Sequence, residues 1–341
     1  MFEDLNEVDR KEMTELLKQS GDANKDIAIA AQIAVAAALT TPIRQGILSG
    51  DNITGIFAPE KFEPGSRVEY PVDFYRPDNA SEFAAYTIPN QGKIPQRQIE
   101  GDVISVPTYD VGSSIDWLLR YAKEARWDIV SRAMQVMEAG VVEKLNNDGW
   151  HTILSGAFDR NLVVSDANAA AGQFTKRLVS LMKLVMRRNG GGNSGSLNRS
   201  RLTHLYVSPE ALEDVRNWGV DQVDEITRRE IFLANDEGAT QIYNVKIMAL
   251  DELGEGQKYQ TYYQNVIAAG AANNGMAASD VELVVGLDLA NANDSFVMPI
   301  REEFQVFADD SLHRSRRQGL YCWGSLGYGL LNNSKVILGS L

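Results

Sequence analysis

The sequence of 341 residues has one cysteine, Cys322, and three histidines, His151, His204 and His313. A single cysteine excludes an internal disulfide and fits a reducing compartment. The histidines do not stand in a metal-ligand spacing such as H-E-x-x-H. Cys322 lies in an apolar stretch between Tyr and Trp, which favours a buried, inert thiol. We therefore expect structural roles for all four residues.

Basic residues are in the minority, with 33 Lys and Arg against 46 Asp and Glu, which gives a formal net charge of −13. Affinity for nucleic acid depends on clustered Lys and Arg, so this balance argues against a free-standing nucleic-acid binder. The first residues are acidic where a secretory leader would be basic. The alanine-rich stretch from Ile27 to Leu39 is too short to span a bilayer. We expect a soluble protein inside a cell, without a membrane partner.

Motifs of catalysis and cofactor binding are also missing. The sequence from Gly324 to Gly329 has glycines at the wrong offsets for a dinucleotide loop, and residues 190–192 lack the Lys-Ser/Thr of a phosphate loop. Residues 22–26 open with the spacing of a calcium loop, but Ile27 and Ile33 stand where glycine and glutamate are required. The sequence therefore predicts no catalytic, cofactor-binding or metal-binding residue, and a protein that is not an enzyme.

A long helical pattern is present from Ser113 to Asn147, about 35 residues, which predicts a helix of roughly 50 Å. Ser113 can cap its start, and the Asn-Asn-Asp-Gly sequence that ends at Gly149 is typical of a helix end. Two apolar lines follow the helix. The first consists of Leu118, Ala122, Ala125, Ile129, Ala133, Val136 and Gly140, and the second of Trp127, Val130, Met134, Met137, Val141 and Leu145. Two apolar faces predict neighbours on both sides, with Arg120, Glu124 and Glu138 facing solvent.

The rest of the chain changes pattern several times. Residues 1–50 predict two short helices, the second ending at Pro42, on an arm that packs on another subunit. Alternating apolar residues between 51 and 110 predict two long antiparallel strands, which need a partner surface because a two-stranded ribbon is marginal in water. Residues 150–157 are strand-like. Residues 161–294 alternate strands and helices and predict an α/β domain. Its predicted elements include a basic amphipathic helix at Phe174 to Arg188, a helix that Ser208 and Pro209 begin, a further helix near 221–233 and a strand at 259–263. Residues 295–341 predict strands that return to a sheet along the long helix.

The end of the chain carries an excess of positive charge. Between Ser311 and Leu341 there are no acids and four cations: Arg314, Arg316, Arg317 and Lys335. Arginine favours bidentate pairing with carboxylate or phosphate. Ion pairs with Asp309, Asp310 or acids of a neighbouring subunit are the favoured interpretation, and contact with DNA is the alternative.

This order of elements resembles the major capsid protein of tailed bacteriophages over essentially the whole chain. Specific stretches also look like that family: Gly92-Lys93-Ile94, Val106 to Asp110 before the helix, Leu205 to Glu210, and the ending from Gly327 to Leu338. The resemblance implies an α+β fold with an N-terminal arm (1–50), an extended two-stranded loop (51–110), a peripheral domain with a spine helix (111–160, helix 113–147), an axial α/β domain (161–294), and a return to the peripheral sheet (295–341).

The resemblance implies a structural protein of the virion whose pentamers and hexamers form an icosahedral shell around packaged double-stranded DNA. Assembly would take place in the host cytoplasm with a portal protein, a separate scaffolding protein and, in some relatives, a decoration protein. Some members crosslink a loop lysine to an asparagine, for which Lys61 or Lys93 with Asn332 or Asn333 are the candidates. An encapsulin-like nanocompartment shell is the closest alternative, and an unrecognised acidic hydrolase is an alternative of another class.

Overall fold

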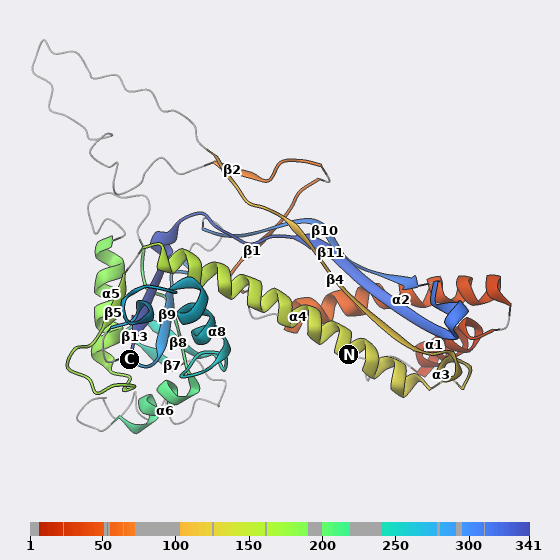
Figure 1. Ribbon diagram of the computed structural model, residues 1–341, viewed down its shortest axis with the longest axis horizontal. Helices are drawn as coiled ribbons and strands as arrows, with labels where there is room; N and C mark the ends of the chain where they lie inside the picture. Colours follow the sequence, from red (N-terminus) through yellow and green to blue (C-terminus); the bar gives the residue numbers. More distant parts are fainter. Residues whose placement is uncertain are drawn as a thin grey trace, which may run out of the picture. The chain divides into compact units, whose positions relative to one another are not determined.

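The computed structural model of this chain describes residues 7–22, 24–50, 53, 55–63, 65–71, 103–124, 126–160, 162–189, 200–218, 240–277, 280–290, 295–309 and 311–341. The chain divides into two compact units. The first contains Met1–Val68, Val106–Gly149 and Met298–Tyr328, and the second contains Glu69–Ser105, Trp150–Val297 and Gly329–Leu341. Both units combine helices with β-structure (Figure 1), which confirms the predicted α+β class.

The first unit is built on a sheet in the order β1-β10-β11-β4, in which β11 pairs antiparallel with both β10 and β4. Its strands are β1 (Ala58–Lys61), β10 (Phe296–Asp309), β11 (Arg317–Leu326) and β4 (Tyr109–Leu118). In β4, Val111 and Trp117 are buried while the residues between them are half-buried or exposed, which is the alternation expected of a strand with one covered face. The structure therefore contradicts the predicted helix over residues 113–118.

Helices α1 (Glu7–Ser20) and α2 (Lys25–Gly50) belong to the same unit as this sheet. The buried residues of α2 recur every three or four positions: Ala28, Ala31, Val35, Leu39, Ile43 and Ile47. Arg44 forms an ion pair with Glu303 of β10, and the Thr40 hydroxyl accepts a hydrogen bond from the Val306 N–H at 3.4 Å. The predicted arm thus contacts β10 of its own chain, and its contact with another subunit stays a prediction.

Helix α2 is longer than predicted, because Pro42 lies inside it and does not end it. The segment Lys25–Ile47 is the one stretch among the described residues that is long and apolar enough to cross a membrane by length and composition. The core helix of a soluble protein meets the same test. The contacts of Thr40 and Arg44 with β10 assign α2 to the fold of the first unit.

The long helix α4 runs over Trp127–Phe158, after a short helix α3 (Leu119–Lys123). Its second predicted apolar line is confirmed, since the following residues are at most 3% exposed: Val130, Met134, Met137, Val141 and Leu145. The first line is wrong as a buried face, because Val136 is 63% exposed and a Cβ at Gly140 would meet no atom within 4 Å. Arg120 and Glu124 are exposed and Glu138 is half-buried. In the part of the chain described, α4 therefore buries one apolar face and leaves the other open.

The predicted end of this helix at Asn147 is also wrong. Helix α4 continues through Gly149 and includes residues 150–157, which the sequence indicated as strand-like. The Asp148 carboxylate accepts hydrogen bonds from the Tyr109 hydroxyl and from Lys144, both at 2.7 Å. A Cβ at Gly149 would lie 2.6 Å from Ile53 Cγ2. Asp148 and Gly149 therefore contact neighbouring residues within a helix that continues past them.

The second unit contains a mixed six-stranded sheet in the order β5-β13-β9-β6-β8-β7 among its described residues. Its strands are β5 (Val163–Ser165), β13 (Val336–Ser340), β9 (Leu283–Leu287), β6 (His204–Val207), β8 (Val245–Ala249) and β7 (Thr240–Ile242). Strand β13 pairs with β5 and β9. The last residues of the chain therefore join this sheet, and not the sheet of the first unit as the predicted return of 295–341 implied.

Helices α5 (Lys176–Asn189), α6 (Pro209–Asn217) and α8 (Lys258–Tyr262) accompany this sheet. The predicted basic helix is confirmed as α5, whose Leu178, Met182 and Met186 are fully buried. Helix α6 begins as predicted, with the Ser208 hydroxyl accepting a hydrogen bond from the Ala211 N–H at 3.1 Å. The predicted strand at 259–263 is wrong, because those residues are helical. The helix predicted near 221–233 lies outside the described residues.

Strands β2 (Glu69–Pro71) and β3 (Val103–Ser105) form an antiparallel pair, as the alternating pattern indicated. The predicted tip between them lies outside the described residues.

Candidate functional site

The four basic residues predicted as a cluster do not share one environment. Arg317 Nη1 lies 3.0 Å from Asp116 Oδ2, so the ion pair joins neighbouring strands β11 and β4. Both side chains are about half exposed, and such a surface pair contributes little stability. Arg316 is exposed and has a positive φ of 57°. The side chain of Arg314 lies outside the described residues.

Among the described residues, Asp309 does not form the predicted ion pair, and pairs with Asp310 or with a neighbouring subunit stay a prediction. The Asp309 carboxylate accepts hydrogen bonds from the backbone and the hydroxyl of Ser311. Asp310 lies outside the described residues. The acid that pairs with Arg317 is instead Asp116, nearly 200 positions earlier in the chain.

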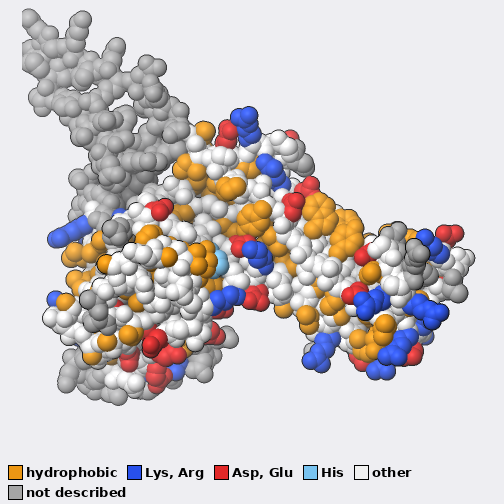
Figure 2. Space-filling model, in the orientation of Figure 1, with side chains coloured by type: hydrophobic (Ala, Val, Ile, Leu, Met, Phe, Trp, Pro, Cys, Tyr) orange, Lys and Arg blue, Asp and Glu red, His pale blue; other side chains and the backbone are white. Residues whose placement is uncertain are grey.

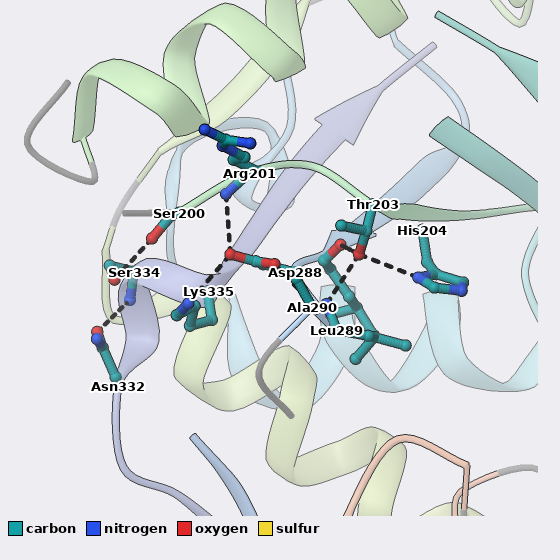
Figure 3. Close-up of polar contacts among 11 residues, drawn as sticks. Ser200, Arg201, Thr203, His204, Asp288, Leu289, Ala290, Asn332, Ser334 and Lys335 are labelled. Atoms are coloured by element: carbon teal, nitrogen blue, oxygen red, sulfur yellow. Dashed lines mark hydrogen bonds and ion pairs between the residues drawn. The ribbon is translucent and has the colours of Figure 1, made fainter. Parts of the chain in front are cut away.

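Lys335 is not a surface cation, which corrects its place in the predicted cluster. Its side chain is 4% exposed and its Nζ lies 3.1 Å from Asp288 Oδ2, a carboxylate that is 1% exposed. The same carboxylate accepts hydrogen bonds from the backbone N–H groups of Arg201 at 2.9 Å and Ala290 at 3.2 Å. Figure 3 shows these groups converging on Asp288 from the segments before β6 and after β9 and from the turn before β13. Lys335 therefore neutralises a buried carboxylate.

The crosslink candidates have other partners in this structure. Lys61 is exposed and forms an ion pair with Glu303, which also contacts Arg44. The two cations hold the pKa of Glu303 below its usual value, with Lys61 the larger cause. The Lys61 ammonium is therefore engaged within its own chain. Lys93 lies outside the described residues.

The asparagines proposed for the crosslink lie at a turn before β13. The Asn332 side chain accepts a hydrogen bond from the Ser334 N–H at 2.9 Å, as Figure 3 shows, so it caps the short helix that leads to Lys335. Asn333 is exposed.

The remaining reactive side chains have structural surroundings. Cys322 is 1% exposed, and burial raises the pKa of its thiol. The His151 ring stacks on Tyr262 with centroids 3.5 Å apart. His204 contacts the Thr203 hydroxyl at 3.0 Å, and burial lowers the pKa of its imidazole. Among the described residues, no group of three or more His, Cys, Asp or Glu side chains could hold a metal ion.

Charges of both signs share the visible surface of the first unit. Figure 2 shows several Lys and Arg side chains where Figure 1 draws α1 and α3, with Asp and Glu side chains among them. The exposed cations of these helices include Lys18, Arg120 and Lys123, and Glu124 is an exposed acid directly after α3. A surface of mixed sign lacks the clustered positive charge on which phosphate-backbone binding depends.

The buried pair of Lys335 and Asp288 is the feature that sequence reasoning missed. The two residues are 47 positions apart, and neither stands in a recognisable motif. The excess of cations near the C-terminus was a real signal, but only the sheet pairing of β13 with β9 shows that one of them is buried.

Solved structures match this fold along most of the chain. The cyanophage Pam1 capsid asymmetric unit aligns with a TM-score of 0.55 at 14% sequence identity, covering 84% of this chain and 88% of that chain. A structure of Microbacterium phage Oxtober96 aligns with a TM-score of 0.54 at 10% identity, covering 86% and 90%. One of Mycobacterium phage Bobi aligns with a TM-score of 0.51 at 12% identity, covering 85% and 89%.

No family model matches the sequence, and the curated proteins give no match either. The similarity thus lies in the order and arrangement of elements, since identities of 10% to 14% leave few shared residues. The predicted resemblance is confirmed at the level of the fold. This chain has the capsid-protein fold of tailed bacteriophages.

Proposed function

We propose that this chain is a major capsid protein that assembles into an icosahedral shell around packaged double-stranded DNA. The observation that carries the proposal is the match to a phage capsid subunit over 84% of this chain and 88% of the other, at a TM-score of 0.55. A match of this extent leaves little of the chain for a separate catalytic domain. The function is therefore structural, located in the virion.

The proposed partners follow from shell assembly. Pentamers and hexamers of this chain would form the shell in the host cytoplasm, with a portal protein at one vertex and a separate scaffolding protein during assembly. A decoration protein is a further candidate partner for the outside of the shell. Heterologous contacts that close into rings supply the geometry of such capsomers.

The content of the particles distinguishes a phage shell from a nanocompartment shell. We expect particles purified from infected cells to retain double-stranded DNA after treatment with external nuclease. Particles that contain a cargo enzyme and no DNA would instead support the nanocompartment alternative. A protein that sediments as a monomer or dimer under all assembly conditions would favour the acidic hydrolase.

The β2-β3 ribbon gives a second test. The two described strands have three residues each, and a two-stranded ribbon is marginally stable in water without a partner. Val103 of β3 is 54% exposed in the single chain, so a neighbouring subunit can cover it. We expect deletion of residues 79–91 to leave a folded chain that assembles poorly. Shells of normal stability from this variant would rule out a role of the loop between subunits.

The arginines just before and at the start of β11 distinguish contact with a protein from contact with DNA. Substituting Arg314, Arg316 and Arg317 by glutamine removes three cations. Loss of shells from a folded chain would identify a protein partner, and intact shells with poor DNA retention would identify phosphate contact. Arg317 already has an acidic partner within its own chain, Asp116.

Covalent crosslinking is tested on mature particles by denaturing electrophoresis. A lysine on the loop, Lys61 or Lys93, and Asn332 or Asn333 would be the linked residues. The ion pair of Lys61 with Glu303 and the cap made by Asn332 favour a single monomer band. A ladder of covalent multimers would show that crosslinking occurs.

A further inference from the structure

Helix α2 leaves one apolar face open in the part of the chain that the structure describes. Figure 1 shows α2 alongside β10, which it contacts through Thr40 and Arg44. On the side opposite its buried residues, Ile27 is 47% exposed and Ile33 is 58% exposed. The other exposed or half-buried residues of this side are Ala30, Ala34, Ala37, Ala38 and Thr41. Folding of the single chain therefore does not cover this side of the helix.

This face carries no charge. The stretch from Ile27 to Ile43 includes no Asp, Glu, Lys or Arg. The outer side of a surface helix is ordinarily charged or polar. Helix α1 of the same unit follows that rule, with Lys11, Glu15 and Lys18 exposed. Single exposed apolar residues are common, but a continuous apolar face on a helix is typical of a contact surface.

The spacing of the exposed residues is that of a contact between two helices. One line of residues, separated alternately by three and four positions, forms what we call the seam: Ile27, Ala30, Ala34, Ala37 and Thr41. This repeat keeps one line of side chains against a partner helix. Ile33 and Ala38 flank the seam on opposite sides, by the rotation of an α-helix per residue. Because most seam residues are small, a second helix can approach to the lower end of the usual range of about 8 to 10 Å between axes.

The charges at the two ends of the seam favour a second copy of α2 in antiparallel orientation. Asp26 directly precedes the seam and Arg44 follows it, and both lie on the same side of the helix as Ile33. In an antiparallel pair, Asp26 of one copy meets Arg44 of the other. A parallel pair would bring like charges together and would align the two helix dipoles. Arg44 is 40% exposed beside Glu303, and its guanidinium has further donors for a second carboxylate.

A lipid bilayer would be the other environment for an apolar helix of this length, since Lys25–Ile47 is long and apolar enough to cross one. Lipid would have to surround the helix on all sides. Val35, Leu39 and Ile43 are instead buried within the first unit, and Thr40 contacts β10. Only the seam side is therefore open to a partner, which favours a protein surface over lipid.

We propose that the seam packs antiparallel against the seam of α2 in a second copy of this chain. A two-fold axis relates the two helices, so one face serves both copies and Ala30 of each lies opposite Thr41 of the other. The proposal rests on the proposed function, because a shell brings many copies of α2 together. It adds the surface through which two of these copies meet.

Disulfide formation in the purified full-length protein tests this contact. The double variant Ala30→Cys with Thr41→Cys carries a thiol near each end of the seam, and the two positions are about 16 Å apart on one helix, too far to link within a chain. Each single variant is the matched control. The parent gives the background, because its Cys322 is 1% exposed. Circular dichroism establishes that every variant is folded.

We expect mild oxidation to convert the double variant into a covalent dimer on non-reducing electrophoresis, with peptides linked between positions 30 and 41. Each single variant should form at least about tenfold less dimer, because its two thiols lie at opposite ends of the antiparallel pair. Adding Ala37→Glu should lower the yield of the double variant about tenfold, because it places a charge in the seam of each copy. Gln19→Glu adds the same charge at an exposed position of α1 and should leave the yield within about twofold.

Absence of a dimer from the double variant would overturn the proposal. Equal dimer yields from a single variant would show a parallel pair or random collision, and would overturn it as well. Flotation of the parent protein with phosphatidylcholine vesicles would show that lipid covers the face. Microscopy of the same preparations reads shell formation separately. Shells without the link would refute this contact and leave the proposed function intact, and a linked dimer without shells would do the reverse.

Discussion

At the scale of single residues, Lys335 and Asp288 show how one buried pair ties three segments of the second unit together. Asp288 accepts hydrogen bonds from Lys335, Arg201 and Ala290, while its own N–H donates to the Lys335 carbonyl at 2.9 Å. Burying two charges costs free energy. The pair matters to stability chiefly because removal of one partner would leave the other charge buried without compensation. We expect this mutual requirement to favour the observed β9-β13 register.

Substitution of Lys335 by methionine should destabilise the protein by about 3 to 5 kcal/mol, because Asp288 would remain buried without its counter-ion. Urea unfolding followed by circular dichroism measures this loss. The double variant Lys335→Met, Asp288→Asn should recover part of it, since it contains no unpaired buried charge. A loss below about 1 kcal/mol in the single variant would contradict the assigned pairing.

Glu282 predicts a dependence of stability on pH. Glu282 is 8% exposed, and burial is the main cause that raises the pKa of its carboxyl above 4.5. The Ser208 hydroxyl donates to the carboxylate and opposes this rise. The negative charges of Glu210, Asp214 and Glu255 raise the pKa further. A raised pKa means that the folded state binds more protons than the unfolded state. The folded state is therefore favoured below about pH 4.5 and loses this advantage as the pH rises.

Glu282→Gln should accordingly raise the melting temperature relative to the parent more at pH 7 than at pH 4. Scanning calorimetry at the two pH values measures the difference. Glu213→Gln is the control, because Glu213 is an exposed acid of the neighbouring helix α6, paired with Arg216. If the two substitutions show the same pH dependence, burial of Glu282 is not the cause.

At the scale of elements, glycines decide where strands and helices can pass each other. A Cβ at Gly327 would lie 2.3 Å from the carbonyl oxygen of Pro107, so the turn after β11 approaches the residues before β4 more closely than a side chain allows. Gly140, in contrast, lies on the open face of α4 with nothing within 4 Å of a Cβ. Substitution of glycine by alanine should therefore change the free energy of unfolding in opposite directions at Gly327 and Gly140.

Gly327→Ala should lower the free energy of unfolding by about 1 to 3 kcal/mol through overpacking against backbone. Gly140→Ala should raise it by about 0.5 to 1 kcal/mol, because alanine is the better helix former and no neighbour must move. Denaturant unfolding of both variants checks the pair. Destabilisation by Gly140→Ala would indicate that this face of α4 is covered.

The long helix shows what periodicity could predict and what it could not. The line from Val130 to Leu145 was predictable because five buried residues at helical spacing carry a strong signal. The start was not, because β4 has few apolar residues and becomes a strand through pairing with β11, where Gly112 lies beside Trp323. The end was not, because Asp148 and Gly149 resemble a stop signal and instead contact Tyr109 and Ile53.

At the scale of the whole molecule, the chain enters and leaves each unit several times. Helix α4 belongs to the first unit up to Gly149 and to the second from Trp150, and β10 passes from the second unit to the first at Met298. Pairings such as β13 with β5 join residues more than 160 positions apart. Local patterns do not specify such partners, so the order of elements was predictable whereas the sheet that takes Val336–Ser340 was not.

In the candidate site too, the charges were predictable from the sequence and their arrangement was not. The excess of cations near the C-terminus was visible in the composition. The composition does not show that Lys335 is buried while Arg316 and Arg317 are exposed. Lys183 and Arg187 were part of a predicted basic helix. That they lie near Arg201 depends on the packing of α5 against β13 and β5, which no sequence pattern contains.

Assembly is the central claim, and electron microscopy of the purified protein in negative stain tests it most directly. The chain should be expressed with a scaffolding protein where one is available, and its sedimentation measured in the same preparation. We expect closed icosahedral shells with many times the mass of one chain. Folded protein that stays monomeric or dimeric in sedimentation, without shells in any field, would contradict it.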